Sequence, residues 1–194
     1  MASAAGGAPA FDLGPASEVL AGRLFLGCAQ NAREVAKGTN PHGITHVLNV
    51  SDGLVLGPGE VNGLATEWVP IADDGEDPVF APAQSEAEYE AAVTADPGAR
   101  PQGAWWRCEA FLRGALEAPH GARVLVHCAL GVNRSATIVV AWLMASQRWD
   151  RQRALKYVQR RRPLVNPVPR HLEQLEAFQA ELGIVASPSR CALQ

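Results

Sequence analysis

The stretch VLVHCALGVNRSATIVVAWLM, residues 124–144, joins two apolar runs through a loop that contains a cysteine, a glycine and an arginine. The run at 124–126 is short and mostly β-branched, which predicts a buried strand. The run at 136–144 is longer and free of Gly and Pro, which predicts a buried helix. The loop therefore opens a helix, where free backbone N–H groups and the positive end of the helix dipole attract anions.

The cysteine of this loop, Cys128, has the surroundings of a reactive thiol. A free thiol has a pKa near ~8.5, but at a helix N-terminus beside a cation the pKa falls to roughly 3.5–7.5. Arg134 supplies that cation, and its planar guanidinium can hold two oxygens of a tetrahedral anion. Together these features predict a nucleophilic thiolate beneath a phosphate-binding cradle. The alternative, a small buried hydrophobe, is the interpretation we expect for Cys28 and Cys108.

The pattern His127-Cys128-x-x-Gly131-x-x-Arg134-Ser135 resembles the signature of the cysteine-dependent protein phosphatases. Over about residues 17 to 184 the chain is similar to the small, atypical dual-specificity branch of that superfamily. The segments that carry this wider similarity are Ser17-Glu18-Val19-Leu20, Leu24-Phe25-Leu26-Gly27, residues 43–50, Trp68-Val69-Pro70-Ile71-Ala72-Asp73, Arg161-Arg162-Pro163 and Gln174-Leu175-Glu176. The resemblance implies an α/β fold. Its mostly parallel central sheet of four to five strands is flanked by helices on both faces, with the phosphate-binding loop between a central strand and a helix.

The same resemblance assigns roles to named residues. Cys128 is the nucleophile, Ser135 donates a hydrogen bond to its sulfur, and His127 packs behind the loop and orients it. Asp73 is the general acid, with the adjacent Asp74 as the alternative. The phosphate is held by the loop residues Ala129, Leu130, Gly131, Val132, Asn133 and Arg134. The resemblance implies neither a metal nor a cofactor.

Two departures from the pattern concern the rim of the pocket. Asn133 stands where many dual-specificity members have serine, and we expect its amide to bond the loop backbone and alter the rate. Residues 166–171 read Asn-Pro-Val-Pro-Arg-His, where relatives often carry a Gly–aromatic pair. The variable loop positions hold no lysine, which favours a substrate with a single phosphate over a phosphoinositide.

The chain divides into three zones. Residues 1–16 are rich in Ala, Gly, Ser and Pro and are expected to form a flexible tail. Residues 17–184 form the catalytic domain, and residues 185–194 a C-terminal tail. Strands are predicted near 24–27, 45–50, 66–71 and 123–127, and helices near 30–37, 104–118, 135–148, 150–161 and 169–182. This alternation favours a largely parallel sheet covered on both faces.

Two charged segments have open interpretations. Residues 75–103 form an acidic insertion, in which Ser85-Glu86-Ala87-Glu88 fits a capping box that begins a short helix. The insertion is either a lid beside the active site or a solvated surface segment. A basic run either attracts acidic phosphopeptides or forms a solvated helix face. Its members are Arg151, Arg153, Lys156, Arg160, Arg161 and Arg162.

The amino-acid composition limits which binding partners and which cellular compartment we expect for this protein. The chain has 194 residues, 47% of them hydrophobic and 19% charged, which fits one globular domain. A net charge of −3 gives no general attraction to nucleic acid. The four cysteines form no zinc spacing, and the proposed chemistry needs a reduced thiol, so we expect a cytoplasmic protein, with the nucleus left open. No secretory signal or membrane span is recognised.

The last four residues add a membrane alternative. Cys191-Ala192-Leu193-Gln194 fits a C-a-a-X prenylation box, and the terminal Gln suggests farnesyl. The alternative is a chance ending. One lipid chain without a polybasic stretch gives weak, reversible attachment. Membrane binding is therefore expected only if Cys191 is lipidated.

The predicted function is a protein phosphatase that hydrolyses phosphotyrosine and phosphoserine or phosphothreonine monoesters through a phosphocysteine intermediate. Its expected partners are phosphorylated proteins or peptides. The alternatives are a phosphoprotein-binding pseudophosphatase and a phosphatase for a non-protein phosphate. A rhodanese-type sulfurtransferase also has a Cys-x5-Arg loop, but that chemistry needs no general acid and explains neither His127 nor Ser135.

Overall fold

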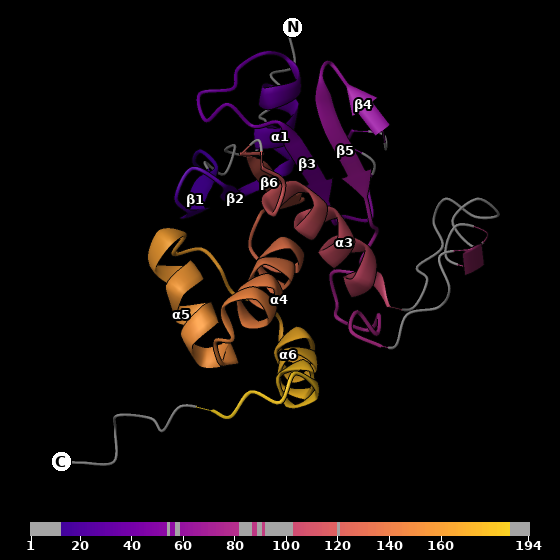
Figure 1. Ribbon diagram of the computed structural model, residues 1–194, viewed down its shortest axis with the longest axis vertical. Helices are drawn as coiled ribbons and strands as arrows, with labels where there is room; N and C mark the ends of the chain where they lie inside the picture. Colours follow the sequence, from indigo (N-terminus) through magenta and orange to yellow (C-terminus); the bar gives the residue numbers. More distant parts are fainter. Residues whose placement is uncertain are drawn as a thin grey trace, which may run out of the picture.

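A computed structural model describes residues 13–53, 55–56, 59–81, 87–88, 91, 103–119 and 121–186. In this part of the chain a central sheet has one helix on one face and four on the other (Figure 1). The strands are β1 (Ser17–Leu20), β2 (Leu24–Cys28), β3 (His46–Asn49), β4 (Gly59–Val61), β5 (Leu64–Trp68) and β6 (Val124–Cys128). The helices are α1 (Ala29–Ala36), α3 (Ala104–Leu116), α4 (Arg134–Gln147), α5 (Arg151–Arg161) and α6 (Pro169–Glu181).

The strand order in the sheet is β1-β2-β6-β3-β5-β4. The four inner strands β2, β6, β3 and β5 are parallel, while β1 and β4 pair antiparallel at the two edges. The predicted α/β class with a mostly parallel sheet is confirmed. The described residues contain six strands, more than the four to five expected. The strand β4 has only three residues and shows no clear sequence pattern, and β1 is indicated only by the resemblance of its segment.

Alternating residues of the inner strands face two separate cores, because successive side chains in a strand point to opposite faces. Leu24 and Leu26 pack with α3, α4, α5 and α6. Phe25, between them, packs with Ala32 and Val35 of α1 on the other face. Helix cover on both faces, as predicted, makes these strands read as continuous apolar runs.

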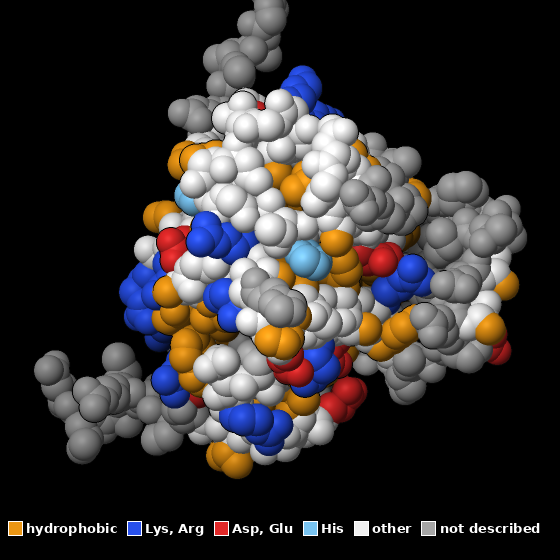
Figure 2. Space-filling model, turned by 45° about the horizontal axis from the view of Figure 1, so that its top comes forward, with side chains coloured by type: hydrophobic (Ala, Val, Ile, Leu, Met, Phe, Trp, Pro, Cys, Tyr) orange, Lys and Arg blue, Asp and Glu red, His pale blue; other side chains and the backbone are white. Residues whose placement is uncertain are grey.

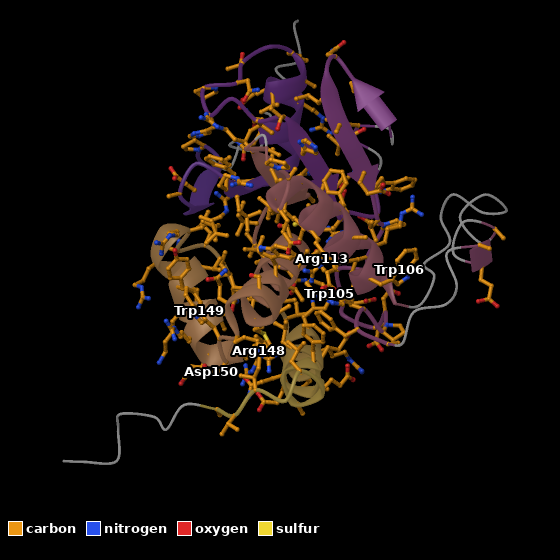
Figure 3. All side chains as sticks on the ribbon, viewed as in Figure 1. Trp105, Trp106, Arg113, Arg148, Trp149 and Asp150 are labelled. Carbon is orange, nitrogen blue, oxygen red and sulfur yellow. The ribbon has the colours of Figure 1, made fainter. Side chains whose placement is uncertain are left out.

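Helix α4 is the centre of the larger core. Its residues 134 through 144 are all buried, and it contacts α3, α5, α6 and the strands β2 and β6. Trp105 of α3, labelled in Figure 3, packs its ring 5.2 Å from that of Phe178 on α6 and 5.8 Å from that of Phe80. Trp105 is therefore a core residue.

One predicted strand ends early. The strand expected at 66–71 is β5, which ends at Trp68, although the Val69 N–H still donates to the Asn49 carbonyl at 2.9 Å. Pro70 has no N–H to continue the ladder, so the chain leaves the sheet there. The segment that follows, up to Asp73, is free to turn toward the end of β6.

The first part of the acidic insertion is anchored on α6. Gln174 Nε2 donates to the carbonyls of Gly75 and Asp77 at 2.8 and 2.9 Å, and the Val79 N–H donates to Gln174 Oε1 at 2.9 Å. Phe80 stacks on Phe178 with ring centroids 4.6 Å apart. Residues 75–81 are thus part of the packed domain.

Other predictions fall outside the described residues. Ala87, Glu88 and Ala91 are helical, but Ser85 and Glu86 of the predicted capping box are among the undescribed residues. Both predicted tails lie largely outside the described part, and Cys191 with them, so its prenylation stays a prediction. Within the described residues no helix has the length and apolar character needed to cross a bilayer.

Candidate active site

The loop between β6 and α4 brings Cys128 and Arg134 together. Cys128 is the last residue of β6 and Arg134 the first of α4, so the loop lies at the carboxyl end of a central strand and at a helix N-terminus. Gly131 has φ +71°, and a Cβ there would clash with the Gly27 carbonyl oxygen. Only glycine fits this turn, which explains its place in the motif.

Four successive carbonyls of this loop bond outward. The Ala129 carbonyl accepts from the Ala29 N–H at 3.1 Å, and the Val132 carbonyl from the Asn166 N–H at 3.0 Å. The Leu130 and Gly131 carbonyls accept from Arg162, at 3.2 Å from Nη2 and 2.8 Å from Nε.

This outward bonding fixes the direction of the next N–H groups. The C=O and N–H of a trans peptide unit point in opposite directions, so the N–H groups of residues 130–133 face the interior of the loop. The Gly131 N–H, at 3.3 Å from Cys128 Sγ, shows this directly. The loop therefore forms a concave set of donors suited to a tetrahedral anion.

The Cys128 thiol lies among hydrogen-bond donors. Ser135 Oγ is 3.2 Å from Sγ, as expected from the sequence. Burial is the largest single influence and raises the pKa of Cys128, but it is outweighed by hydrogen bonds from Ser135 and Gly131 and by the charge of Arg134. The net shift lowers the pKa of Cys128, which favours the thiolate. Burial raises the pKa of Cys108, in contrast, so that thiol stays protonated.

Arg134 is buried and held by two carboxylates. Its Nη1 donates to Asp52 Oδ1 at 2.7 Å and to the Ile71 carbonyl at 3.3 Å, and its Nε lies 2.8 Å from Asp73 Oδ1. The guanidinium is therefore fixed at the mouth of the loop before an anion arrives. A bound phosphate dianion would compete with both carboxylates for these N–H groups.

The two candidate acids differ in where their carboxylates lie. Asp73 lines the cavity above Cys128, whereas Asp74 Oδ1 accepts from the Glu76 N–H at 3.0 Å within the turn. The Ala72 N–H donates to Asp77 Oδ2 at 2.5 Å, which closes the same turn. The segment after β5 thus presents Asp73, and not Asp74, to the loop.

The amide of Asn133 bonds differently from the prediction. Its Nδ2 donates to the Asp73 carbonyl at 2.7 Å and to Asp73 Oδ1 at 3.0 Å. Its Oδ1 accepts from the Val168 N–H at 3.0 Å and lies 2.7 Å from His171 Nδ1. The expected bond to the loop backbone is therefore replaced by bonds to two other segments, because both pack within reach of the amide.

His127 is fully buried behind the loop. Its Nδ1 lies 3.3 Å from the Cys128 carbonyl oxygen, so the ring bonds the first peptide of the loop, which fits the predicted orienting role. Burial lowers the pKa of His127 to about 4. The ring is therefore neutral at pH 7 and donates from Nδ1.

Sequence reasoning missed or misplaced three residues of the site. The sequence places Arg162 in the basic run of residues 151–162, which is wrong, because Arg162 is buried and its guanidinium bonds the loop carbonyls. Asp52 and His171 carry no motif of their own, since each reaches the site only through the packing of distant segments. A phosphate-binding loop turns its N–H groups inward, so its carbonyls point outward and need hydrogen-bond donors. Nothing in the sequence identifies Arg162 as the donor to the carbonyls of residues 130–131.

Two other basic residues of α5, Arg151 and Arg153, make surface contacts. Arg151 Nε lies 2.7 Å from Glu176 Oε2, and the guanidinium of Arg153 lies 4.4 Å from the centre of the Trp149 ring. Figure 2 shows Lys and Arg side chains spread over one face, with Asp and Glu side chains between several of them. These contacts fit the solvated-face interpretation of the run.

A cavity of about 170 Å³ opens over the sulfur. Its lining residues are Asp73, Cys128, Leu130, Val132, Asn133, Arg134, Asn166 and Val168. A larger cavity of about 430 Å³ lies between residues 75–81 and α6, but no cysteine, serine or histidine lines it, so the chemistry belongs to the smaller one. Among the described residues, no three His, Cys, Asp or Glu side chains gather as metal ligands would.

Known proteins with similar sequences and structures point to one family. A family model described as dual specificity phosphatase, catalytic domain, matches residues 102–181. Human dual specificity protein phosphatase 13B is 36% identical over 163 residues, which cover 82% of this chain and 71% of that protein. Bovine dual specificity protein phosphatase 26 is 36% identical over 171 residues, 86% of this chain and 68% of that protein.

A solved structure agrees with these sequence matches. The crystal structure of human DUSP28 superposes with a TM-score of 0.60 at 27% identity, over 88% of this chain and 96% of that one. The sequence matches extend well beyond the loop and cover most of the described fold. The chain therefore belongs to the dual-specificity protein phosphatases, a family of phosphoric monoester hydrolases.

Proposed function

We propose that the chain hydrolyses phosphate monoesters of proteins, on tyrosine and on serine or threonine, through a phosphocysteine intermediate. The observation that carries this proposal is the Cys128 thiol, which lies beneath an anion-binding loop and has a lowered pKa. Family membership supports the substrate class. A nucleophile and an anion cradle on one loop are the elements that phosphoryl transfer to sulfur requires.

In the first step the Cys128 thiolate attacks phosphorus in line. A sulfur–phosphorus bond forms as the bond from phosphorus to the leaving oxygen breaks. The inward N–H groups of residues 130–133 and the guanidinium of Arg134 stabilise the charge on the equatorial oxygens. Because this dianion takes over Arg134, the Asp73 carboxyl is released from its ion pair and can turn to the leaving oxygen as the general acid. Its proton passes to the departing phenolate or alkoxide.

In the second step water attacks the phosphocysteine. The Asp73 carboxylate accepts a proton from that water as the sulfur–phosphorus bond breaks, and inorganic phosphate leaves. The Ser135 hydroxyl, 3.2 Å from Sγ, stabilises the thiolate that forms. Each residue thus ends the cycle in the state in which it began.

The walls of the cavity favour one phosphate group. Leu130, Val132 and Val168 are apolar, and the cationic side chain that lines the cavity is Arg134. A second phosphate on the substrate would meet apolar walls in place of a cation. A phosphoamino acid side chain fits this lining better than a polyphosphorylated headgroup does.

The test is turnover of p-nitrophenyl phosphate by the full chain and by two cysteine variants. Cys128→Ser should lose nearly all activity, because the serine hydroxyl stays protonated at neutral pH, and the variant should still bind phosphopeptides. Cys108→Ser changes a thiol that lies away from the loop and is the matched control, expected to keep its activity. Full activity in Cys128→Ser would refute the mechanism. A wild-type chain that binds phosphopeptides without turnover would indicate the pseudophosphatase alternative.

A further inference from the structure

The side chain of Asn133 links the acid segment to helix α6. Its Nδ2 reaches both the carbonyl and the carboxylate of Asp73, at 2.7 and 3.0 Å. Its Oδ1 reaches the Val168 N–H at 3.0 Å and His171 Nδ1 at 2.7 Å. Three segments that are far apart in the sequence therefore meet at one amide, next to the cavity.

The chemistry of the partners fixes which atom donates in each bond. The Val168 N–H can only donate, so the amide oxygen of Asn133 must face it, and the amide nitrogen then faces the oxygens of Asp73. His171 Nδ1 faces the same amide oxygen and must therefore carry a proton. His171 is fully buried, and burial lowers its pKa, so the ring is neutral with that single proton on Nδ1.

Asp73 depends on this amide once a substrate is bound. Its side chain is 58% exposed and lies on a turn, and its carboxylate is held by Arg134 and Asn133. The phosphate of a substrate takes the guanidinium of Arg134. Among the contacts described for the carboxyl, only the one from Asn133 Nδ2 then remains to direct it toward the leaving oxygen.

We infer that His171 and Asn133 form a positioning pair, in which the Nδ1–H of His171 fixes the Asn133 amide and that amide holds Asp73 for proton transfer. This inference rests on the proposed function, because it concerns the general acid of that reaction. Neither residue contacts the transferred proton, so His171 acts through Asn133. A general acid contributes typically 10²–10⁴-fold, and a misdirected acid loses part of that factor.

The experiment compares kcat/KM for two aryl phosphates, because this constant reports the step in which the leaving group departs. p-Nitrophenolate leaves with little help from an acid, whereas phenolate, with a pKa near that of tyrosine at about 10, needs the proton. His171→Phe keeps the bulk of the ring and removes the donor. His171→Asn restores an N–H near the position of Nδ1. His46→Phe, on β3 away from the loop, is the control for replacing a histidine.

The expected result is a selective loss. His171→Phe should lower kcat/KM about tenfold or more for phenyl phosphate, and about twofold for p-nitrophenyl phosphate, since only the first substrate uses the full effect of the acid. His171→Asn should recover most of the loss, and His46→Phe should show none. A change in stability alone would lower kcat/KM equally for both substrates, and His171→Asn would not restore it.

A second variant keeps the inference testable if His171→Phe fails to fold. In Asn133→Asp the new carboxylate still accepts from Val168 and His171 but cannot donate to Asp73. The value of kcat/KM should therefore again fall more for phenyl phosphate than for p-nitrophenyl phosphate. Equal losses on both substrates, no loss, or a His171→Asn variant as impaired as His171→Phe would each overturn the inference. Activity that survives Cys128→Ser would instead overturn the proposed function, so the two failures are distinguishable.

Discussion

At the scale of single residues, the site works through a few short contacts to one sulfur. Burial alone would keep Cys128 protonated, and the donors around it reverse that effect. Ser135 contributes through both its hydroxyl and its backbone N–H, which makes it the main contributor among these donors. The neighbouring donors therefore lower the pKa of Cys128 and make it nucleophilic, and substituting them should change its reactivity.

Removing the Ser135 hydroxyl should make the thiol less acidic. A hydrogen bond to the charged form lowers a pKa, so its loss in Ser135→Ala should raise the pKa of Cys128. The rate of inactivation by iodoacetate, followed against pH, measures this directly, and its midpoint should move to higher pH. Ser146→Ala on the same helix, where Ser146 Oγ donates to the Trp142 carbonyl, is the control. An unchanged midpoint in Ser135→Ala would contradict the assignment.

Asparagine variants of the two adjacent aspartates should separate their roles. Asp73→Asn removes the carboxyl that lines the cavity and should lower kcat/KM for phenyl phosphate by about 10²-fold or more. Asp74→Asn keeps an oxygen that can accept from the Glu76 N–H, so it should be nearly silent. A larger loss in Asp74→Asn than in Asp73→Asn would transfer the acid role to Asp74.

At the scale of elements, the phosphate loop takes its shape from the segment after α5. Arg162 lies just beyond that helix and donates to two successive loop carbonyls. Residues 166–171 then return past the loop, where the Asn166 N–H holds a further carbonyl and His171 meets Asn133. The two departures noted in the sequence, at Asn133 and at 166–171, are thus in direct contact.

Arg162→Gln should weaken both the loop and the fold. Two hydrogen bonds from a charged donor are lost, at about 1.5–3 kcal/mol each, so the free energy of unfolding should fall by about 3–6 kcal/mol. Inhibition by inorganic phosphate should weaken at least tenfold, because the N–H groups no longer converge. Denaturant unfolding and inhibition kinetics measure the two effects.

Arg161→Gln provides the comparison for Arg162. Its guanidinium lies 3.5 Å from the centre of the Tyr157 ring at the surface, a contact that contributes about 1 kcal/mol or less. Phosphate inhibition should stay unchanged in this variant. If both variants weakened phosphate binding equally, a general effect of positive charge would explain the result better than loop support.

At the scale of the whole molecule, local patterns were predictable and long-range contacts were not. The sequence predicts the Cys128–Arg134 loop because its strand, turn and helix are contiguous, and the apolar runs predict the parallel inner strands. Arg162 was misplaced because an arginine beside a basic helix face usually lies at the surface. Asp52 carries no signal in the sequence. The departure at 166–171 marks the segment of His171 but not its contact with Asn133, since such contacts arise only when distant segments pack together. The edge strand β4 is not predicted because its three residues show no clear alternation, and β1 is indicated only by the resemblance of residues 17–20.

The buried histidines should make the whole fold sensitive to acid. His127 has a pKa of about 6.5 when unfolded and about 4 when folded, so between these values the unfolded chain binds more protons. The contribution of His127 to the free energy of unfolding is therefore complete above pH 6.5. It falls by about 3 kcal/mol as the pH decreases from 6.5 to 4. Burial lowers the pKa of His171 as well, which acts in the same direction.

Denaturant unfolding at several pH values checks this dependence. In His127→Leu the free energy of unfolding should fall less steeply between pH 6.5 and 4, because one buried titrating group is gone. The slope at pH 7 to 8 should match that of the unchanged chain. Equal slopes in both proteins below pH 6.5 would show that His127 titrates normally in the folded state.

The most direct test of the whole account is to trap the covalent intermediate. The full chain is mixed with p-nitrophenyl phosphate and quenched in acid within the first turnover. The protein is then digested, and the masses of its peptides are measured by mass spectrometry. The account predicts one added phosphoryl group on the peptide that contains Cys128, and none there in Cys128→Ser. Turnover without phosphate on Cys128, or with phosphate on another residue, would contradict it.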